Sequence, residues 1–203
     1  MRTSTILALI VLSMLTSRIS YSQDYSQNGP TRLFAAQQWD AIVLVGALPT
    51  YVADKATVDV PPVSAGLSYM VSPIFGVDFL IGHSISTSSK HFFTDQAYAT
   101  WTNALYFAAI RPAIHFTKRD NIDIYGGMSM GFHYSKMTGN PGGDLSTLRL
   151  SDYENHLGIK STWKPAFSGF LGARYALSPN LTINSEIGFN VSILSIGLGY
   201  RLK

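Results

Sequence analysis

A two-residue alternation recurs along this chain and constrains its fold more than any other feature. From Ile122 to Tyr134, one set of alternate positions reads Ile, Ile, Gly, Met, Met, Phe, Tyr, and the other reads Asp, Tyr, Gly, Ser, Gly, His. Side chains on a β-strand point alternately to opposite faces, so this segment predicts a strand with one apolar and one polar side. The segment is also long enough to cross a bilayer, which takes a tilted strand of about 9–11 residues.

The same alternation predicts eight strands, at about 38–48, 62–71, 74–86, 102–116, 122–135, 163–177, 181–191 and 194–202. Short connections made of turn residues (Ser72-Pro73, 117–121 and Ser178-Pro179-Asn180) alternate with long ones (49–61, 87–101 and 136–162). Outer-membrane barrels alternate in this way, with short periplasmic turns and longer outer loops. The connection between Val191 and Leu194 is the exception, because it is almost absent on the outer side. The first strand is apolar on both faces, which leaves its register open.

The N-terminus has the pattern of a secretory signal peptide over residues 1–22. Arg2 precedes the apolar stretch Ile6 to Leu15, and small residues stand before Gln23. A retained helical anchor is the alternative, but ten apolar residues fall short of the about 20 that a spanning helix needs. We expect residues 23–37 to be a periplasmic lead-in and residues 38–203 to be one domain. The chain has no cysteine, which excludes a disulfide scaffold and a lipoprotein anchor.

The composition is too apolar for an ordinary soluble surface. Charged residues make up 13% of the chain, against about 25–35% on the surface of a soluble domain. No apolar run reaches the length of a spanning helix, so an exported chain of this kind predicts a closed transmembrane β-barrel. Without Arg2 and Arg18, 13 basic residues face 12 acidic ones, and no basic stripe indicates a nucleic-acid partner.

The glycine- and serine-rich positions of the strands also carry isolated charges. If that face met lipid, each arginine at mid-depth would cost about 2–4 kcal/mol, against a total stability of about 5–15 kcal/mol. We therefore expect outer-membrane lipid on the apolar face and an interior charge network of Asp78, Arg111, Asp123, Arg174, Glu186 and Arg201.

Sequence positions predict partners within this network. Arg174 and Glu186 lie almost symmetrically about one turn, Asp78 and Arg111 lie at similar heights on neighbouring strands, and Asp123 and Arg201 could meet diagonally. We interpret these as structural pairs; the alternative is a gate that opens when the pairs rearrange. An eight-stranded barrel has an interior that side chains just fill, which favours a plug.

Aromatic residues of the apolar face gather near the ends of the strands. Such rings favour the two membrane interfaces, so they predict two girdles around an aliphatic belt. The periplasmic girdle would contain Tyr69, Phe75, Phe116, Tyr175 and Tyr200, and the external girdle Tyr106, Phe132, Tyr134, Phe167 and Phe189.

Two segments resemble a known family. They are the hairpin from Gly169 through Ser178-Pro179-Asn180 to Phe189, and the closing run from Ile196 to Lys203. The chain resembles the small outer-membrane β-barrel domain family, of the OmpX kind and the transmembrane domain of OmpA. The resemblance implies an all-β, eight-stranded, antiparallel up-and-down transmembrane barrel in the outer membrane, inserted by the barrel assembly machinery. Where the family usually ends on an aromatic residue, this chain ends on Leu202-Lys203.

The leading functional hypothesis is a structural or surface-interaction protein that acts through its external loops, chiefly 87–101 and 136–162, on a ligand that the sequence does not identify. The alternative is a narrow channel for small or hydrophobic molecules, similar to the OmpW type. A soluble barrel with its apolar face inward is disfavoured, because its exterior would consist of glycine, serine and a few ions.

No catalytic centre, cofactor site or metal site is predicted. His115 and His133 share the inward face but lie toward opposite ends of their strands, and His83 belongs at the interface. Asp152, Glu154 and His156 alternate in the longest loop and could ligate a cation if that segment were a strand. We favour the simpler interpretation of a solvated hairpin edge, and we expect no enzyme activity.

Overall fold

A computed structural model describes residues 34–49, 56–92, 97–116, 121–143, 160–189 and 191–202. The expected signal peptide, most of the lead-in and the Asp152, Glu154 and His156 triad lie outside the described residues. Among the described residues, no helix is long and apolar enough to cross a membrane.

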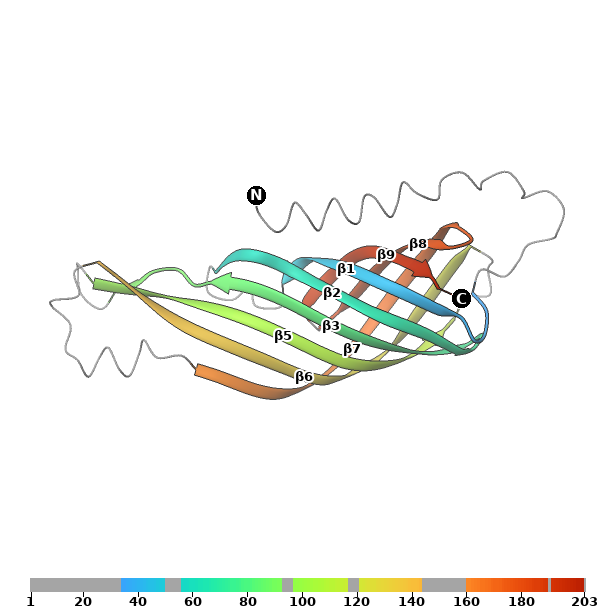
Figure 1. Ribbon diagram of the computed structural model, residues 1–203, viewed down its shortest axis with the longest axis horizontal. Coiled ribbons are helices and arrows are strands. Elements are labelled where there is room, and N and C mark those ends of the chain that lie inside the picture. Colours follow the sequence, from blue (N-terminus) through green and yellow to red (C-terminus); the bar gives the residue numbers. More distant parts are fainter. Residues whose placement is uncertain are drawn as a thin grey trace. The chain divides into compact units, whose positions relative to one another are not determined.

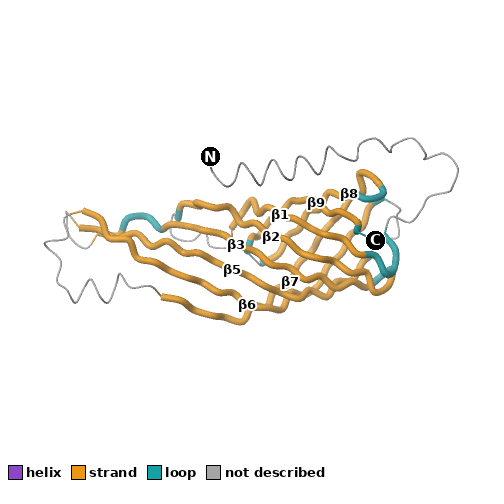
Figure 2. Tube along the Cα trace, viewed as in Figure 1, coloured by secondary structure: helices purple, strands orange, loops and turns teal. Residues whose placement is uncertain are grey.

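Eight antiparallel strands form a closed barrel (Figures 1 and 2). They are β1 (Trp39–Pro49), β2 (Thr57–Ser72), β3 (Phe75–Thr87), β5 (Ala97–His115), β6 (Ile122–Gly143), β7 (Lys160–Ser178), β8 (Leu181–Gly188) and β9 (Ser192–Arg201). Each strand pairs with the next, and β1 pairs with β9 to close the ring. A two-residue strand, β4 (His91–Phe92), pairs with β5 alone. The expected eight-stranded up-and-down barrel is confirmed.

The strands differ in length around the ring. β5, β6 and β7 have 19, 22 and 19 residues and remain paired far beyond their expected outer ends. β8 has only 8 residues. The expected strand over 181–191 is therefore too long: β8 ends at Gly188, and Val191 turns into the lumen, where it is 2% exposed. The nearly absent outer connection is confirmed, because β9 begins at Ser192.

The outward positions of the strands form an apolar belt. Ile81, Ile110, Leu171 and Ile187 are each at least half exposed on the barrel wall. Lipid is the medium that makes such a surface stable, because a closed barrel can pair its backbone groups between strands. The alternation in the sequence thus reports the two faces correctly.

The inward positions form two layers of different chemistry. In the outer part of the lumen, apolar side chains pack together: Ile42, Leu44, Leu80, Leu105, Phe107, Ala109 and Val191. Toward the short turns β2–β3, β5–β6 and β7–β8, the interior is instead charged. We call these the apolar layer and the charged layer. In outer-membrane barrels the short turns lie on the periplasmic side, so we refer to the half of the lumen that holds the charged layer as the periplasmic half.

Candidate functional site

The charged layer begins with a row of polar residues that the strand register places side by side. Arg201, Asp40, Ser68, Asp78 and Arg111 are successive register partners on β9, β1, β2, β3 and β5. Residues directly opposite on neighbouring antiparallel strands share one face of the sheet. The sheet therefore gathers this row on the inner wall.

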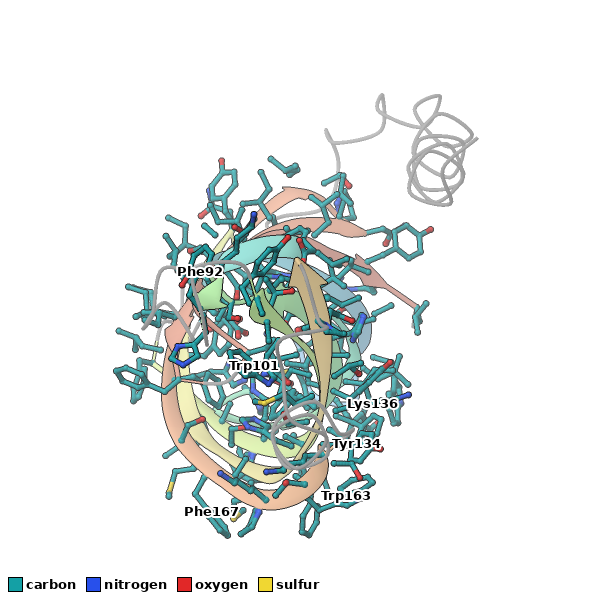
Figure 3. The ribbon with its side chains drawn as sticks, turned by 90° about the vertical axis from the view of Figure 1, so that its left-hand side faces the viewer. Phe92, Trp101, Tyr134, Lys136, Trp163 and Phe167 are labelled. Atoms are coloured by element: carbon teal, nitrogen blue, oxygen red, sulfur yellow. The ribbon has the colours of Figure 1, made fainter. Side chains whose placement is uncertain are left out.

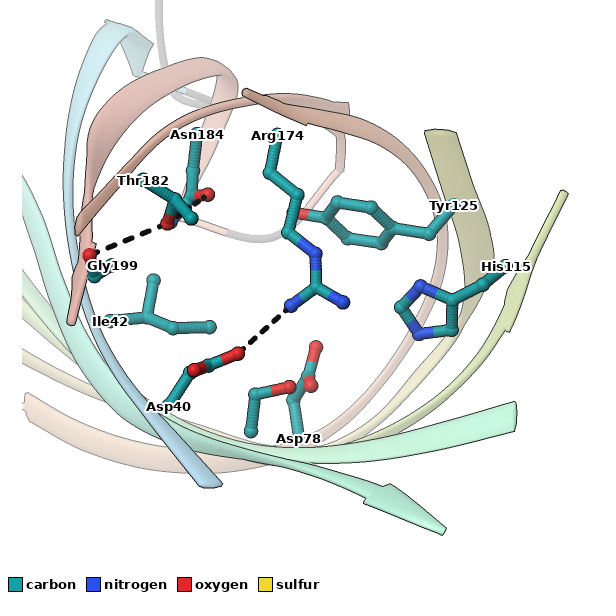
Figure 4. Close-up of a pocket in the computed structure, with 10 residues that line it drawn as sticks. Asp40, Ile42, Asp78, His115, Tyr125, Arg174, Thr182, Asn184 and Gly199 are labelled. Atoms are coloured by element: carbon teal, nitrogen blue, oxygen red, sulfur yellow. Dashed lines mark hydrogen bonds and ion pairs between the residues drawn. The ribbon is translucent and has the colours of Figure 1, made fainter. Parts of the chain in front are cut away.

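Arg174 is the hub of the layer. Its Nε donates to Oδ2 of Asp123 at 2.6 Å, and its Nη1 donates to Oδ2 of Asp40 at 3.1 Å (Figure 4). All three side chains are buried. Removing such charges from water costs several kcal/mol per ion unless partners compensate them, so this arginine stabilises two carboxylates at once.

The residues just before β1 close over this hub. The guanidinium carbon of Arg174 lies 4.2 Å from the ring centroid of Phe34. Gln38 donates through Nε2 to both carboxylate oxygens of Asp40, at 2.8 and 2.6 Å. The backbone nitrogen of Gln37 donates to the carbonyl of Met70 at 2.6 Å. These contacts hold the segment before β1 against the charged layer.

A second group of side chains surrounds Glu186. Its Oε2 accepts a hydrogen bond from Nη2 of Arg111 at 2.8 Å, and its Oε1 accepts one from the hydroxyl of Tyr125 at 2.7 Å. The guanidinium of Arg111 lies 3.8 Å from the ring centroid of Phe170. Gly172 makes room for this group, because a Cβ there would overlap the ring of Tyr125. Arg111 thus crosses the lumen from β5 to β8.

His115 joins the two groups. Its Nδ1 lies 2.7 Å from Oδ2 of Asp123, and its ring stacks on Tyr125 with centroids 5.5 Å apart. An ionised carboxylate only accepts hydrogen bonds, so Nδ1 of His115 carries a proton in this contact.

The structure corrects two of the expected pairs. Arg174 does not pair with Glu186, because the register of β7 and β8 places Arg174 opposite Asn184 and Glu186 opposite Gly172. Asp123 does not pair with Arg201, since it is bound by Arg174 and His115.

The third expected pair, Asp78 and Arg111, has the predicted register position, but the two side chains form no ion pair. Asp78 and Arg111 lie directly opposite each other on β3 and β5. Arg111 nevertheless turns across the lumen to Glu186. Asp78, Arg111, Asp123, Arg174 and Glu186 are buried, and Arg201 is half-buried at the end of β9.

Sequence reasoning missed three members of the layer: Asp40, Tyr125 and Gln38. Asp40 lies on the strand whose two faces look equally apolar, so its direction was open. Tyr125 does lie on the glycine-rich alternate positions, between Asp123 and Gly127. That alternation was the available signal for an inward tyrosine.

The residues of the expected external girdle lie on the outer wall, and two of them, Tyr106 and Tyr134, belong to a longer ladder of rings. The rings of His83, Tyr106, Tyr134 and Trp163 follow one another across β3, β5, β6 and β7, with centroid distances of 4.5, 6.0 and 4.8 Å. Tyr134, Trp163 and Phe167 lie outside the wall in an end-on view (Figure 3). Phe132, Phe167 and Phe189 are exposed.

The residues of the expected periplasmic girdle also face outward. Tyr69 packs beside Trp39 with centroids 4.6 Å apart, which adds a tryptophan to this set. Phe75, Phe116, Tyr175 and Tyr200 are exposed at the end of the barrel that carries the short turns.

Interior space is limited in both layers. One cavity of about 10 Å³ lies within the charged layer, and another of about 20 Å³ lies beside the apolar layer. A water molecule needs about 10–15 Å³ by this measure. Each of these two cavities thus has room for about one water-sized occupant.

No protein-family model matches the chain, and no curated protein sequence matches it. Solved structures do. The outer-membrane protein OprG from Pseudomonas aeruginosa is 14% identical over 83% of this chain and 97% of that chain, with a TM-score of 0.50.

Two further solved structures are similar at lower scores. Ail of Yersinia pestis, the attachment invasion locus protein, is 11% identical over 81% of this chain and 97% of that chain, with a TM-score of 0.46. The N-terminal β-barrel domain of OprF from Pseudomonas aeruginosa is 10% identical over 83% of this chain and 99% of that chain, with a TM-score of 0.47.

At such identities the similarity shows the fold alone. The expected resemblance to small outer-membrane barrels is confirmed at that level. Together with the lipid-facing wall, it shows that this chain folds as an integral β-barrel membrane protein of the outer-membrane kind.

Proposed function

We propose that this protein is exported by its signal peptide, inserted into the outer membrane by the barrel assembly machinery, and serves there as a closed scaffold. Its role is to hold an interaction surface outside the membrane, and it is not an enzyme. The filled lumen carries this proposal. The charged layer and the apolar layer block the interior at two successive depths, which leaves the outer surface as the working part.

The length of β5 supports an outward role. Its ten residues from Tyr106 to His115 match the length that crosses the hydrocarbon. The preceding nine residues, Ala97 to Leu105, extend the strand past the aromatic ladder by roughly 30 Å at about 3.3 Å per residue. β6 remains paired with β5 along this whole extension, up to Gly143 opposite Ala97. We call this two-stranded extension the outer ribbon.

The outer ribbon and the short strand β4, which pairs with it, carry aromatic side chains of the kind that bind partners. Phe92 is 58% exposed and packs against Tyr98 with ring centroids 5.5 Å apart. The Nζ of Lys90 lies 4.3 Å from the centroid of the same Tyr98 ring. Aromatic residues supply a large contact area at low entropic cost, which favours a protein or glycan partner at this end.

The placement of the described histidines supports a non-enzymatic role. His115 is buried in the charged layer, His133 packs edge-on against Phe107, and His83 stacks on Tyr106 at the membrane interface. General acid–base chemistry needs such a group within hydrogen-bond reach of a bound substrate. His115 lies at a different depth from the other two rings, and His83 and His133, at neighbouring heights, lie on opposite faces of the wall.

A narrow channel is the second candidate, and the apolar layer is the observation that favours it. An apolar outer lumen suits small hydrophobic molecules better than ions. We expect the purified protein in planar bilayers to show no stable single-channel conductance. A reproducible conductance from the unmodified protein would favour the channel over the scaffold.

The outward position of the ribbon can be tested directly, because the chain has no cysteine. Phe92→Cys in intact cells should react with a membrane-impermeant maleimide. Pro179→Cys, in the β7–β8 turn, is the matched control and should react only after the outer membrane is permeabilised. The opposite pattern would invert the barrel and refute the proposed role.

A further inference from the structure

The outward face of β6 and β7 carries the most exposed large apolar side chains of the barrel. Phe167 is 71% exposed and Trp163 is 69% exposed, the two largest fractions among the large hydrophobic residues that the structure describes. Trp163 lies opposite Tyr134, and their ring centroids are 4.8 Å apart. Such rings favour the level of the lipid headgroups, so this ring pair marks the outer interface on these two strands.

On the membrane side of the ring pair, the wall is recessed at Gly169. This glycine occupies an outward position opposite Met128, between the outward side chains of Phe167 and Leu171 on its own strand. Apart from its chain neighbours, a Cβ added there would meet one atom within 4 Å, the carbonyl oxygen of Gly127 at 3.9 Å. Met128, Phe167 and Leu171 are all exposed. Three apolar side chains therefore project around a position without a side chain, which leaves space for a hydrocarbon chain.

The recess lies about one leaflet deep. Gly169 is midway along β7 between Trp163 in the ladder and Tyr175 in the periplasmic girdle. The distance from Trp163 to Gly169 is about 20 Å along the strand at about 3.3 Å per residue, and a tilt of about 45° reduces it to about 14 Å of depth. One leaflet of hydrocarbon is about 15 Å thick, since the whole core measures about 30 Å. A lipid whose headgroup is level with the ring pair therefore reaches the recess with its acyl chain.

A lysine lies just outside the ring pair on the same face. Lys136 is the next outward residue of β6 after Tyr134, and it is exposed. Figure 3 shows it beside Tyr134 on the outside of the wall. Its register neighbours are Ala104 on β5 and Ser161 on β7, and neither carries a charge. Within the described residues, no carboxylate forms an ion pair with Lys136, because all the salt bridges there belong to the charged layer.

We propose that this face of β6 and β7 binds one lipid of the outer leaflet that carries an anionic phosphate headgroup. The ammonium of Lys136 binds the phosphate, the Tyr134–Trp163 pair packs at the boundary of the headgroup, and an acyl chain lies in the recess at Gly169. A lysine at the membrane surface attracts anionic headgroups. The cation, the rings and the recess follow one another in the order and at the spacing of the parts of one lipid. The site goes beyond the scaffold role and does not depend on it, because a conducting barrel could hold the same lipid.

Quenching of tryptophan fluorescence by brominated lipids measures this binding in the folded barrel. The chain has three tryptophans, so Trp39→Phe with Trp101→Phe leaves Trp163 as the reporter. The protein is placed in phosphatidylcholine vesicles with a rising share of brominated phosphatidic acid. With Lys136 present, the site should bind phosphatidic acid about fivefold more tightly than phosphatidylcholine, the effect of one lysine at a headgroup. Lys136→Gln should make the binding of the two lipids equal.

Lys164→Gln is the matched control. Lys164 is also exposed and follows Trp163 in the sequence, but it lies opposite His133 on the inward positions. The variant removes the same charge from the other face, so the preference for phosphatidic acid should remain. Equal binding of the two lipids with both lysines present would overturn the proposal. An equal loss of preference in the two lysine variants would overturn it too, because it would indicate a general attraction to the protein's charge.

A second measurement tests the recess. Gly169→Leu fills it with an apolar side chain at an outward position that has room for a Cβ, so the barrel should still fold. Native mass spectrometry of the detergent-extracted protein should find one phosphatidic acid retained by the wild type and less by Gly169→Leu and Lys136→Gln. Retention by Gly169→Leu at the level of the wild type would contradict the placement of the acyl chain.

Discussion

The two halves of the lumen are filled by side chains that interact in different ways. In the periplasmic half, Arg174 binds carboxylates from β1 and β6, and Arg111 on β5 reaches Glu186 on β8. In the outer half, Leu80 and Leu105 pack in an apolar cluster with neighbours such as Ile42 and Phe107. The charged layer depends on direction and pairing, whereas the apolar layer depends on volume.

The two layers therefore contribute differently to the fold: the charged layer makes strand pairing specific, and the apolar layer contributes packing. A charge that loses its partner remains buried, so one substitution in the charged layer disturbs several strands at once. An aliphatic side chain that is shortened leaves a cavity whose cost scales with its volume. We therefore expect the charged layer to fix which strands oppose one another, and the apolar layer to seal the lumen.

The largest effect is expected at the hub. Arg174→Ala should destabilise the barrel by about 3–5 kcal/mol, because Asp40 and Asp123 would stay buried without their cation. Urea unfolding followed by circular dichroism measures the change. Adding Asp40→Asn and Asp123→Asn to the same variant should recover part of the loss; no recovery would mean that the arginine acts by bulk and not by charge.

A smaller loss is expected in the apolar layer. Leu80→Ala should cost about 2–5 kcal/mol through lost burial and the cavity left behind. The same unfolding assay applies, with Leu80→Met as the volume-conserving control at under about 1.5 kcal/mol. If the alanine variant gained conductance without losing stability, the apolar layer would be a constriction and not a packed core.

An arginine should destabilise the barrel on the outward face of the wall, although the adjacent inward position holds one. Ile110→Arg, adjacent to the buried Arg111, should cost about 2–4 kcal/mol because it would place a cation in lipid. Thr138→Arg, also on an outward position but beyond the aromatic ladder, should cost about 0–1 kcal/mol. Equal costs at the two positions would contradict the assigned membrane boundary.

The smallest effect concerns the aromatic ladder. A double-mutant cycle on Tyr134 and Trp163, whose ring centroids lie 4.8 Å apart, should give a coupling of about 0.5–1.5 kcal/mol. A cycle on Tyr134 and Phe79 is the control, since Phe79 lies on β3 opposite Ile110, away from the ladder. The coupling energy between Tyr134 and Phe79 should be near zero. Similar coupling energies in the two cycles would show that the rings of the ladder do not stabilise one another specifically.

The sequence predicts the two faces of the wall well and the pairs inside it poorly. Lipid on one side forces apolar residues at every second position, so Ile81 and Ile110 are assigned by alternation alone. The predicted pair Arg174–Glu186 is wrong because the two residues are two positions apart in the register, with Arg174 opposite Asn184. Arg111 reaches a strand that is not its neighbour, and no count along adjacent strands could find that contact.

Local ambiguity accounts for the other misses. β1 is apolar on both faces, so the direction of Asp40 depended on tertiary pairing with Ser68 and Arg201. Val191 continued the alternation of β8 in sequence but not in space, because Phe189 is still exposed whereas Val191 is buried in the lumen. In both cases the neighbouring strands decide, and a single segment does not contain that information.

The most direct test of the central claim compares methyl groups on the two sides of the wall by NMR in lipid nanodiscs. A lipid-soluble spin label should broaden the methyl signals of Ile81, Ile110 and Leu171, and neither it nor a water-soluble relaxation agent should broaden those of Leu80 and Leu105. Broadening of Leu80 and Leu105 by the water-soluble agent would show a water-filled lumen and contradict a closed scaffold.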